Sequence, residues 1–220
     1  DADESLALRF TPRPSPWGGT PLGPPPERLE EIRRRGADVF RWMKPPRPTV
    51  RLADSERTTL GRRGWTALFT PGHTDDHLCL LSEDGILLAG DQVLPTITPH
   101  ISGMLPDDPL AAYVDSLDRL AALPGVSLVL PAHGHPFTDL GRRVTEIQEH
   151  HVERLDELRR IGSELGWASV VELSQRLFAP RSWGGMAEDE TYAHLEHLRL
   201  HGGAEVREEA GVLLYKLATG

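Results

Sequence analysis

Three short apolar runs in this sequence each end in a polar motif that contains histidine or aspartate. WTALF precedes TPGHTDDH at residues 70–77, ILLA precedes Gly90 and Asp91, and VSLVL precedes PAHGHP at residues 131–136. Short apolar runs bounded by Pro and Gly predict buried strands. Polar residues at strand ends are the usual position of sites in α/β proteins. The chain is therefore constrained to a fold that presents side chains from several strand ends.

The pattern around these runs predicts a layered α/β core over residues 50–162. Strands are expected over residues 49–56 and 65–71, and a β-hairpin over residues 77–91 that turns at Gly85. A helix capped by Asp107 or Asp108 follows. The fully apolar run at residues 126–131 is typical of an interior strand, and a long helix is expected over residues 140–161.

The two ends of the chain differ from this core. Ten of the 19 prolines lie between Pro12 and Pro48, so we expect residues 1–49 to be an extended arm or mobile insertion, with a short charged helix over residues 27–35. Residues 163–220 predict two helices and a β-hairpin, which is the pattern of a winged-helix module. Three segments are therefore expected: 1–49, 50–162 and 163–220.

Composition excludes several classes of protein. The net charge is −9, from 24 basic and 33 acidic residues, which argues against non-specific binding to nucleic acid or to an anionic membrane. The sequence holds no apolar run of about 18 residues, the length that a membrane-spanning helix needs. The single cysteine, Cys79, rules out an intrachain disulfide and a thiolate zinc site. It fits a reducing compartment, so we expect a cytoplasmic protein.

The three strand-end motifs supply His73, Asp91 and His133. Each motif alone has a simpler interpretation: a polar turn, a capping aspartate or a structural loop. Together they make a metal-ligand set, because imidazoles bind borderline metals and a carboxylate can bridge two cations.

The order TPGHTDDH, GD followed by VLPTITP, and PAHGHP resembles the C-terminal half of the metallo-β-lactamase superfamily, whose fold is an αββα sandwich. The resemblance covers residues 50–162. It implies that His73 is a terminal ligand of a first metal, that Asp91 bridges both metals, and that His133 is a terminal ligand of a second. The resemblance also implies that His77 supports the site, since the matching residue is usually not a ligand in this family, and His135 departs from the usual pattern.

The C-terminal tail resembles the winged-helix module of the β-lactamase-like protein 2 subgroup. That subgroup includes a mitochondrial endoribonuclease and many bacterial hydrolases. The superfamily signature HxHxDH, which supplies most of the remaining ligands, does not occur in the sequence. We therefore expect either that the chain lacks most of the N-terminal half of the sandwich or that the protein is degenerate, and the absence of a complete first sheet favours truncation. The resemblance implies that residues 1–49 are the proline-rich insertion between the halves or a partial N-terminal region.

The resemblance implies a metal-dependent hydrolase that uses a metal-activated hydroxide on an ester, a thioester or a phosphodiester. Two zinc ions are expected, although iron and manganese occupy related sites. Asp91 is the expected catalytic residue, since it would hold the two ions together. His77, His100 and His135 are expected to support the ligands or to contact substrate. Activity is expected to require the N-terminal half.

Two other functions stay open: a degenerate, non-catalytic scaffold and a winged-helix protein that binds nucleic acid. The helix expected over residues 186–201 has the wrong charge for phosphate contacts. It carries four acidic residues against one arginine: Glu188, Asp189, Glu190, Glu196 and Arg199. The module is therefore expected to pack on the core or to mediate a homodimer. A small-molecule ester or thioester is the expected substrate, and an RNA substrate stays open.

Overall fold

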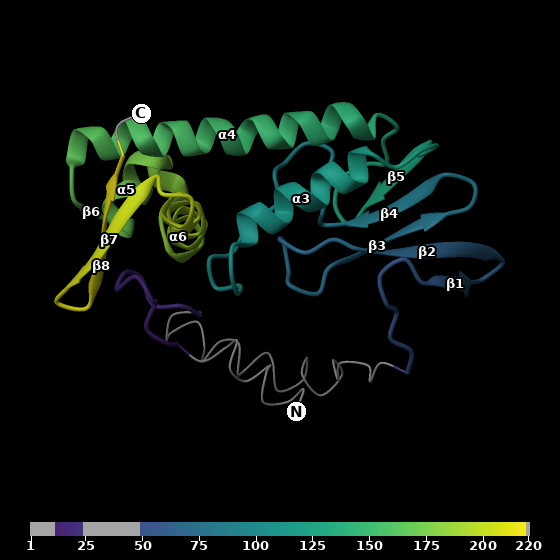
Figure 1. The fold of residues 1–220 in the computed structure, drawn as a ribbon, viewed down its shortest axis with the longest axis horizontal. Helices are drawn as coiled ribbons and strands as arrows, with labels where there is room; N and C mark the ends of the chain where they lie inside the picture. Colours follow the sequence, from purple (N-terminus) through teal and green to yellow (C-terminus); the bar gives the residue numbers. More distant parts are fainter. Residues whose placement is uncertain (1–11, 24–48, 219–220) are drawn as a thin grey trace.

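The computed structural model describes residues 12–23 and 49–218 (Figure 1). The short helix expected over residues 27–35 lies outside this range, as does most of the expected proline-rich segment. No helix in the described ranges combines the length and apolarity that crossing a lipid bilayer requires.

The larger sheet has five strands in the order β1-β2-β3-β4-β5. They are β1 (Arg57–Leu60), β2 (Arg63–Phe69), β3 (Leu78–Ser82), β4 (Ile86–Gly90) and β5 (Leu128–Pro131). Neighbours pair antiparallel from β1 to β4, and β4 pairs parallel with β5. The hairpin expected over residues 77–91 is confirmed as β3 and β4, and Gly85 has a φ of +83° at its turn.

Two strand predictions need correction. The prediction of a strand over residues 49–56 is wrong, since the first strand, β1, begins after this segment. Ser55, just before it, adopts a φ of +61°. Asp54 accepts hydrogen bonds from the Phe69 backbone N–H and from Arg119, which lie 15 and 65 residues away along the chain, and these contacts fix the turn at Asp54 and Ser55. Within the described sheet β5 is an edge strand and not an interior one. Its Val129 is nevertheless fully buried, which accounts for the apolar pattern.

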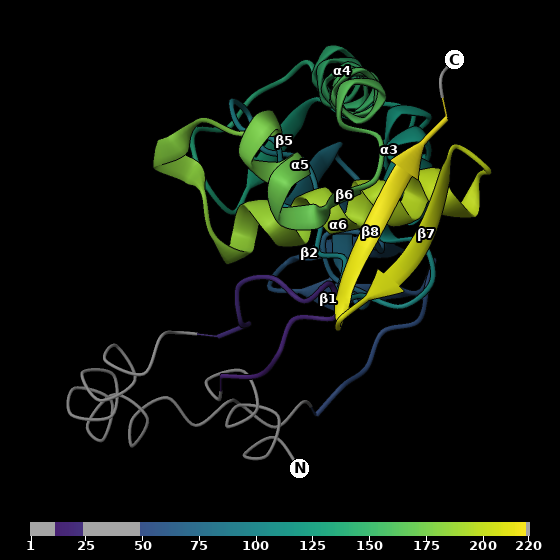
Figure 2. The same cartoon turned by 90° about the vertical axis from the view of Figure 1, so that its left-hand side faces the viewer.

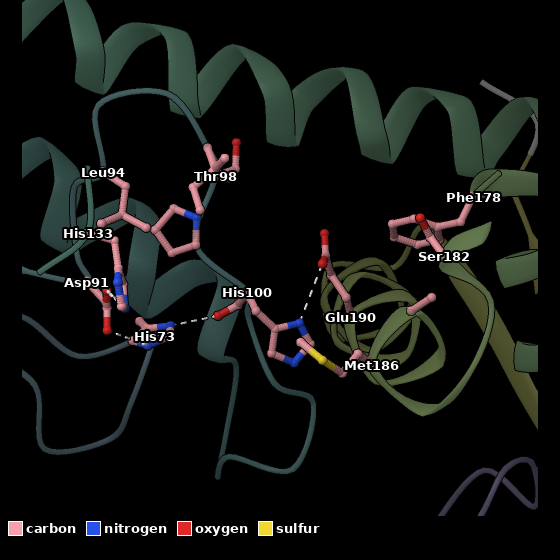
Figure 3. A pocket seen from close by; sticks show the side chains of 13 residues that line it. His73, Asp91, Leu94, Thr98, His100, His133, Phe178, Ser182, Met186 and Glu190 are labelled. Carbon is pink, nitrogen blue, oxygen red and sulfur yellow. Dashed lines mark hydrogen bonds and ion pairs between the residues drawn. The ribbon is translucent and has the colours of Figure 1, made fainter. Parts of the chain in front are cut away.

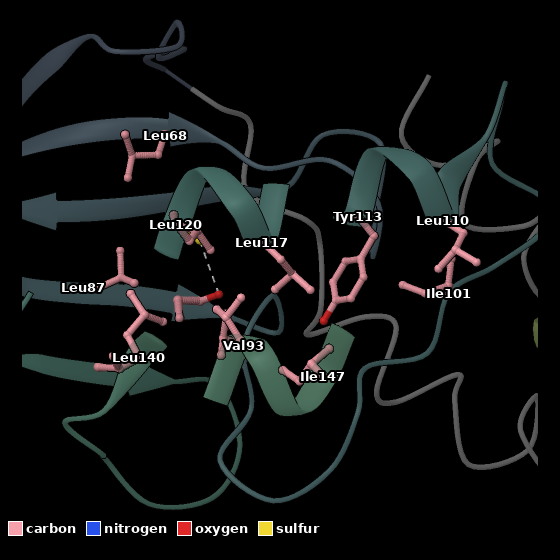
Figure 4. Packing of buried hydrophobic residues seen from close by; sticks show 14 of the residues in the cluster. Leu68, Leu87, Val93, Ile101, Leu110, Tyr113, Leu117, Leu120, Leu140 and Ile147 are labelled. Carbon is pink, nitrogen blue, oxygen red and sulfur yellow. Dashed lines mark hydrogen bonds between the residues drawn. The ribbon is translucent and has the colours of Figure 1, made fainter. Parts of the chain in front are cut away.

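Two helices cover this sheet and form the first core with it. Helix α3 (Pro109–Ala121) is capped by the Asp108 side chain, and α4 (Leu140–Leu165) is capped by Asp139. Figure 4 shows how side chains from both helices meet those that follow β4. The fully buried members include Leu110, Tyr113, Leu117 and Leu120 of α3, Ile147 of α4, and Val93 and Ile101. Burying each such aliphatic side chain contributes about 1.5–3 kcal/mol to stability.

The C-terminal unit contains the expected order of helix, helix and hairpin. It consists of β6 (Ala168–Ser169), α5 (Val170–Leu177), a 3₁₀ turn η1 (Pro180–Ser182), α6 (Gly185–Leu200), β7 (Ala204–Glu209) and β8 (Val212–Leu217). The three strands form a small sheet in the order β6-β8-β7. Helix α5 begins with a capping box between Ser169 and Glu172.

Helix α4 joins the two units as one continuous rod (Figures 1 and 2). Val144 and Ile147 near its start belong to the first core, while Leu158 and Ile161 belong to a second core in the C-terminal unit. The expected boundary after residue 162 falls inside this helix, which continues to Leu165. The two units therefore share an element, and no linker separates them at that point.

The described part of the proline-rich segment, residues 12–23, is anchored and does not form a free arm. Trp17 is fully buried in the second core, and its ring lies 5.1 Å from that of Tyr192. The Trp17 indole N–H and the Thr20 backbone N–H both donate to the Glu188 carboxylate, at 2.9 and 2.8 Å. One large aromatic side chain with a polar partner thus anchors the segment. The high proline content of the sequence gives no indication of this contact.

Candidate metal centre

The direction of the strands brings the three motifs to one edge of the sheet. Strands β2 and β4 are both antiparallel to β3, so they run in the same direction, and β5 is parallel to β4. The C-terminal ends of β2, β4 and β5 therefore meet at the same edge. His73 follows β2, Asp91 follows β4 and His133 follows β5.

The side chains of these three residues converge (Figure 3). His73 Nε2 lies 3.9 Å from Asp91 Oδ2, and His133 Nε2 lies 3.5 Å from Asp91 Oδ1. Each imidazole thus faces a different oxygen of one carboxylate. This is the arrangement that a carboxylate shared between two cations needs, with one histidine on each side.

Two observations indicate that the three converging side chains suit metal ions. Asp91 Oδ1 is buried and has no hydrogen-bond partner among the described residues, which is costly for a carboxylate oxygen unless a cation or water meets it. His73 Nδ1 lies 2.8 Å from the His100 backbone oxygen. Because a carbonyl only accepts, Nδ1 carries a proton and donates it, so Nε2 is the ring nitrogen that is left to bind an ion beside Asp91. His133 adds a second imidazole, with 72% of its side chain exposed.

Glycines shape the loops that present these ligands. Gly72, one residue before His73, has a φ of +130°, and a Cβ there would lie 2.4 Å from the Tyr113 Cα atom. Gly90, one residue before Asp91, has a φ of +55°, and a Cβ there would lie 2.7 Å from His77 Nε2. Both positions need glycine for backbone conformation and for space.

Neither His77 nor His135 faces Asp91 as the two proposed ligands do, although the centroid of the His77 ring lies 6.3 Å from that of His73. His77 Nδ1 is 2.9 Å from Thr70 Oγ1, and the ring packs behind Gly90. Burial, and then the nearby His73, lower the pKa of His77 below its ordinary value. His77 is therefore placed to brace the loop as a neutral ring. His135 is exposed and does not line the cavity at the sheet edge.

A cavity of about 530 Å³ opens over the converging side chains. One wall comes from the core and includes His73, Asp91, His100 and His133. The other wall comes from the C-terminal unit and includes Phe178, Met186 and Glu190 (Figure 3). The C-terminal unit thus forms part of the same cavity as the strand-end motifs.

His100 connects the two walls. Its Nε2 lies 3.0 Å from Asp189 Oδ2 and its Nδ1 lies 3.5 Å from Glu190 Oε2, while its backbone oxygen holds His73. Burial alone would lower the pKa of His100, but hydrogen bonds to Asp189 and Glu190 outweigh it and raise the pKa to about 9. At neutral pH this side chain is a cation between two carboxylates of α6.

Asp189 and Glu190 were not recognised as site residues from the sequence. They appeared only as acidic residues on a helix, and their partner His100 is about 90 residues away along the chain. Arg143 was also missed: its guanidinium donates to the backbone oxygens of Leu94 and Ile97, at 2.6 and 2.9 Å. It therefore fixes the segment after Asp91. No local signal marks either arrangement.

The family of the chain is decided by a sequence match that spans the strand-end motifs. The model of the metallo-beta-lactamase superfamily matches residues 15–133, more than half of the chain. The chain belongs to the metallo-beta-lactamase superfamily. The match starts well before residue 50, where the resemblance was expected to begin, and ends at His133.

Solved structures of this superfamily share the fold. A beta-lactamase domain protein from Burkholderia ambifaria is 32% identical, with a TM-score of 0.72 over 84% of this chain and 60% of that one. A metallo-beta-lactamase family protein from Thermus thermophilus is 29% identical, with a TM-score of 0.68 over 87% of this chain and 66% of that one. Both alignments cover more of this chain than the superfamily match does.

Curated relatives include lactamase-like proteins and one named as a probable metallo-hydrolase. The chain is 33% identical over 158 residues to the lactamase-like protein vrtG of Penicillium aethiopicum, which covers 71% of this chain and 47% of that protein. It is 30% identical over 125 residues to a probable metallo-hydrolase, YqjP of Bacillus subtilis. That alignment covers 54% of this chain and 39% of YqjP. The chain thus matches less than half the length of either relative.

Proposed function

We propose that this chain supplies one half of the catalytic centre of a metal-dependent hydrolase that cleaves an ester, a thioester or a phosphodiester. The observation that carries the proposal is the Asp91 carboxylate, which has one oxygen facing each imidazole and a buried Oδ1 without a partner among the described residues. Family membership and the names of the curated relatives support the hydrolase class.

The roles proposed for the side chains follow from where each one points. Two zinc ions, when bound, would lower the pKa of water and polarise the scissile carbonyl or phosphoryl group. Asp91 would hold the ions together through its two oxygens, and His73 and His133 would each bind one ion. His100 fixes the tautomer and orientation of His73 through its backbone oxygen.

The cavity walls suggest how a substrate is held. Leu94, Ile97, Phe178 and Met186 provide an apolar lining beside the three proposed ligands. Such a lining suits an acyl or other apolar group. Protonated His100 adds a positive charge at the wall, although Asp189 and Glu190 already balance it. A small-molecule ester or thioester therefore fits this cavity better than a strongly anionic substrate.

The proposed centre needs further ligands. A zinc ion usually takes at least three protein ligands, and here three side chains would be shared between two ions. The sequence contains no HxHxDH motif, which supplies such ligands in the superfamily. We therefore propose that a segment carrying HxHxDH, in the same chain or in a partner chain, completes the centre.

The C-terminal unit is proposed to be a winged-helix-like module that packs on the hydrolase core. Its second long helix, α6, is an internal packing element whose acidic side chains have partners within the protein. Glu188 binds Trp17, Asp189 binds His100, and Glu196 binds Tyr215. We therefore expect no salt-sensitive binding of the chain to a random DNA or RNA duplex through α6, measured by fluorescence anisotropy. Binding that Arg199→Ala abolishes would contradict this.

The test compares the chain alone with the chain completed by a segment that carries HxHxDH, in cis or as a partner. We measure zinc retained after dialysis and turnover of a generic thioester and a generic phosphodiester. The chain alone should retain little zinc at the centre that contains Asp91 and should show no turnover. The completed protein should bind zinc at that centre and turn over substrate. Asp91→Asn in the completed protein should abolish both again.

Two outcomes would contradict the proposal. If the completed protein binds Asp91-dependent zinc but turns over no substrate of either class, the chain is a scaffold and not a hydrolase. If the chain alone turns over substrate at the rate of the completed protein, the count of missing ligands is wrong. In that case His77, His100 and His135 are the first residues to mutate.

A further inference from the structure

A second cluster of metal-binding side chains lies at the other end of α6, away from the cavity. His197 Nδ1 is 2.9 Å from Asp108 Oδ2, and His201 Nε2 is 3.0 Å from the same oxygen. One ligand atom from each residue lies within 4.8 Å of those from the other two. His201 is 11 residues after Glu190, or about 16 Å along the axis of a helix, so this cluster is separate from the strand-end centre.

The local sequence explains why the two imidazoles meet. His197 lies in the last turn of α6 and His201 is its C-cap residue, four positions later. Residues four apart lie on the same face of a helix, and the two rings have a centroid separation of 4.4 Å. A cation at this point also meets the negative end of the helix dipole.

The third ligand is held in place by an independent interaction. Asp108 caps α3, and its Oδ1 accepts a hydrogen bond from the Ala111 backbone N–H at 3.0 Å. The carboxylate is therefore oriented before any ion arrives, with Oδ2 turned toward α6. Asp108 belongs to the core and the two histidines belong to the C-terminal unit, so neither unit holds the cluster by itself.

The spacing of the donors is close to that of a zinc site. In a tetrahedral site with bonds of about 2.0–2.2 Å, the donor atoms are about 3.3–3.6 Å apart. The two distances to Asp108 Oδ2 would have to open by a few tenths of an ångström. The side chain of His201 is 60% exposed, and Asp108 also lines a cavity of about 220 Å³ with Asp75 and Asp107. An ion can reach the cluster, and the nearby carboxylates attract it.

We propose that Asp108, His197 and His201 bind one divalent transition-metal ion of the zinc class, with water in the remaining position. Two imidazoles and one carboxylate are borderline to hard donors, which suit zinc better than calcium or magnesium. The ion fastens the C-terminal end of α6 to the N-terminal end of α3. It thereby holds the helix whose other end supplies Met186 and Glu190 to the cavity wall.

The experiment measures zinc affinity and thermal stability of the full chain and of four single variants. His201→Ala and His197→Ala remove ligands of the proposed site. Asp91→Asn disables the strand-end centre, and His150→Ala removes an imidazole from α4 that belongs to neither site. Zinc binding is followed by calorimetry, cobalt substitution by its visible absorption, and unfolding by the melting temperature with and without zinc.

We expect one equivalent of zinc, or of cobalt with a visible absorption band, to bind the chain, Asp91→Asn and His150→Ala with similar affinity. Zinc should raise the melting temperature of all three. His201→Ala and His197→Ala should lose at least about 100-fold in zinc affinity, together with the rise in melting temperature. Since His201 is mostly exposed, His201→Ala should fold normally. It therefore tests the proposal even if His197→Ala does not fold.

Zinc affinity of His201→Ala within threefold of the unchanged chain would overturn the proposal. So would loss of all zinc binding in Asp91→Asn, because the ion would then belong to the strand-end centre. The absence of any zinc binding to the unchanged chain would show that the three side chains form only a hydrogen-bonded cluster.

Discussion

Single residues before the proposed ligands decide whether those ligands converge. Asp91 follows Gly90, whose φ of +55° turns the chain at the end of β4. His77 fills the space beside Gly90 and is itself held by Thr70. The orientation of the carboxylate thus depends on a residue that has no side chain and on a histidine that binds no ion in the proposed centre.

Replacing Gly90 by alanine tests this dependence. We expect Gly90→Ala to lower the free energy of unfolding by about 1–3 kcal/mol, from the left-handed backbone and the contact with His77. Gly61→Ala is a matched control, since Gly61 has a φ of +66° and nothing within 4 Å of its Cβ position. Urea unfolding measures both. An equal loss in the two variants would show that the His77 contact contributes nothing.

Among the elements, α6 has the most unusual environment. Its polar side chains are all buried or half-buried, and Glu188, Asp189, Thr191 and His194 are among the buried ones. Asp189 accepts from His100 and from the Gly103 backbone N–H at 3.1 Å. The helix therefore positions the segment after β4, and through His100 it supports His73.

Asp189→Asn should weaken that support. The neutral amide no longer stabilises protonated His100, so the pKa of His100 should fall from about 9 toward its ordinary value. NMR titration of the imidazole measures this, and Glu205→Gln on β7 is the control, because Glu205 is exposed in the hairpin. An unchanged pKa of His100 in Asp189→Asn would mean that Glu190 alone maintains the ion pair.

The sequence predicted the elements that depend on local chemistry. The hairpin at Gly85, the cap at Asp108 and the helix, helix and hairpin of the tail are all present. The His73, Asp91 and His133 side chains converge because strand direction brings them to one edge and glycines shape the loops that present them. Their roles as metal ligands stay a prediction.

Other features depend on contacts between distant segments and could not be predicted. The burial of Trp17 requires Glu188, which lies 171 residues later. The contact of His100 with Asp189 requires that α6 pack against the core. The prediction of a strand over residues 49–56 is wrong for the same reason. Asp54 pairs with Arg119, and the alternating pattern of the sequence does not reveal that contact.

At the scale of the whole molecule, the two cores meet at a buried histidine pair. His151 of α4 and His194 of α6 lie 3.1 Å apart between Nδ1 and Nε2, and His194 Nδ1 donates to the Glu190 backbone oxygen. Burial lowers the pKa of His151 to about 3 and that of His194 to about 4. Charged groups near the pair shift its pKa values in opposite directions. Glu190 raises both pKa values, while Arg154 and the imidazole of His150 lower that of His151.

This pair predicts acid sensitivity. In the unfolded chain both histidines titrate near pH 6.5, whereas in the folded protein they stay neutral to about pH 4, so the unfolded state binds more protons between these values. Stability should therefore fall as the pH falls from 6.5 to 4, by up to about 1.4 kcal/mol per pH unit for each histidine. Urea unfolding across this range measures the slope. His151→Leu should reduce it, and an unchanged slope in that variant would contradict the assignment.

The continuity of α4 also limits how this chain can change in length. The helix packs through Val144 and Ile147 at one end and through Leu158 and Ile161 at the other. One residue inserted between these ends would rotate the downstream part by about 100° and advance it by about 1.5 Å, turning the Phe178 wall away from Asp91. Seven inserted residues would restore the rotation to within about 20° but add about 10 Å of length. The middle of α4 thus sets both the relative rotation and the spacing of the two halves of the cavity, so a change of length there would move one cavity wall relative to the other.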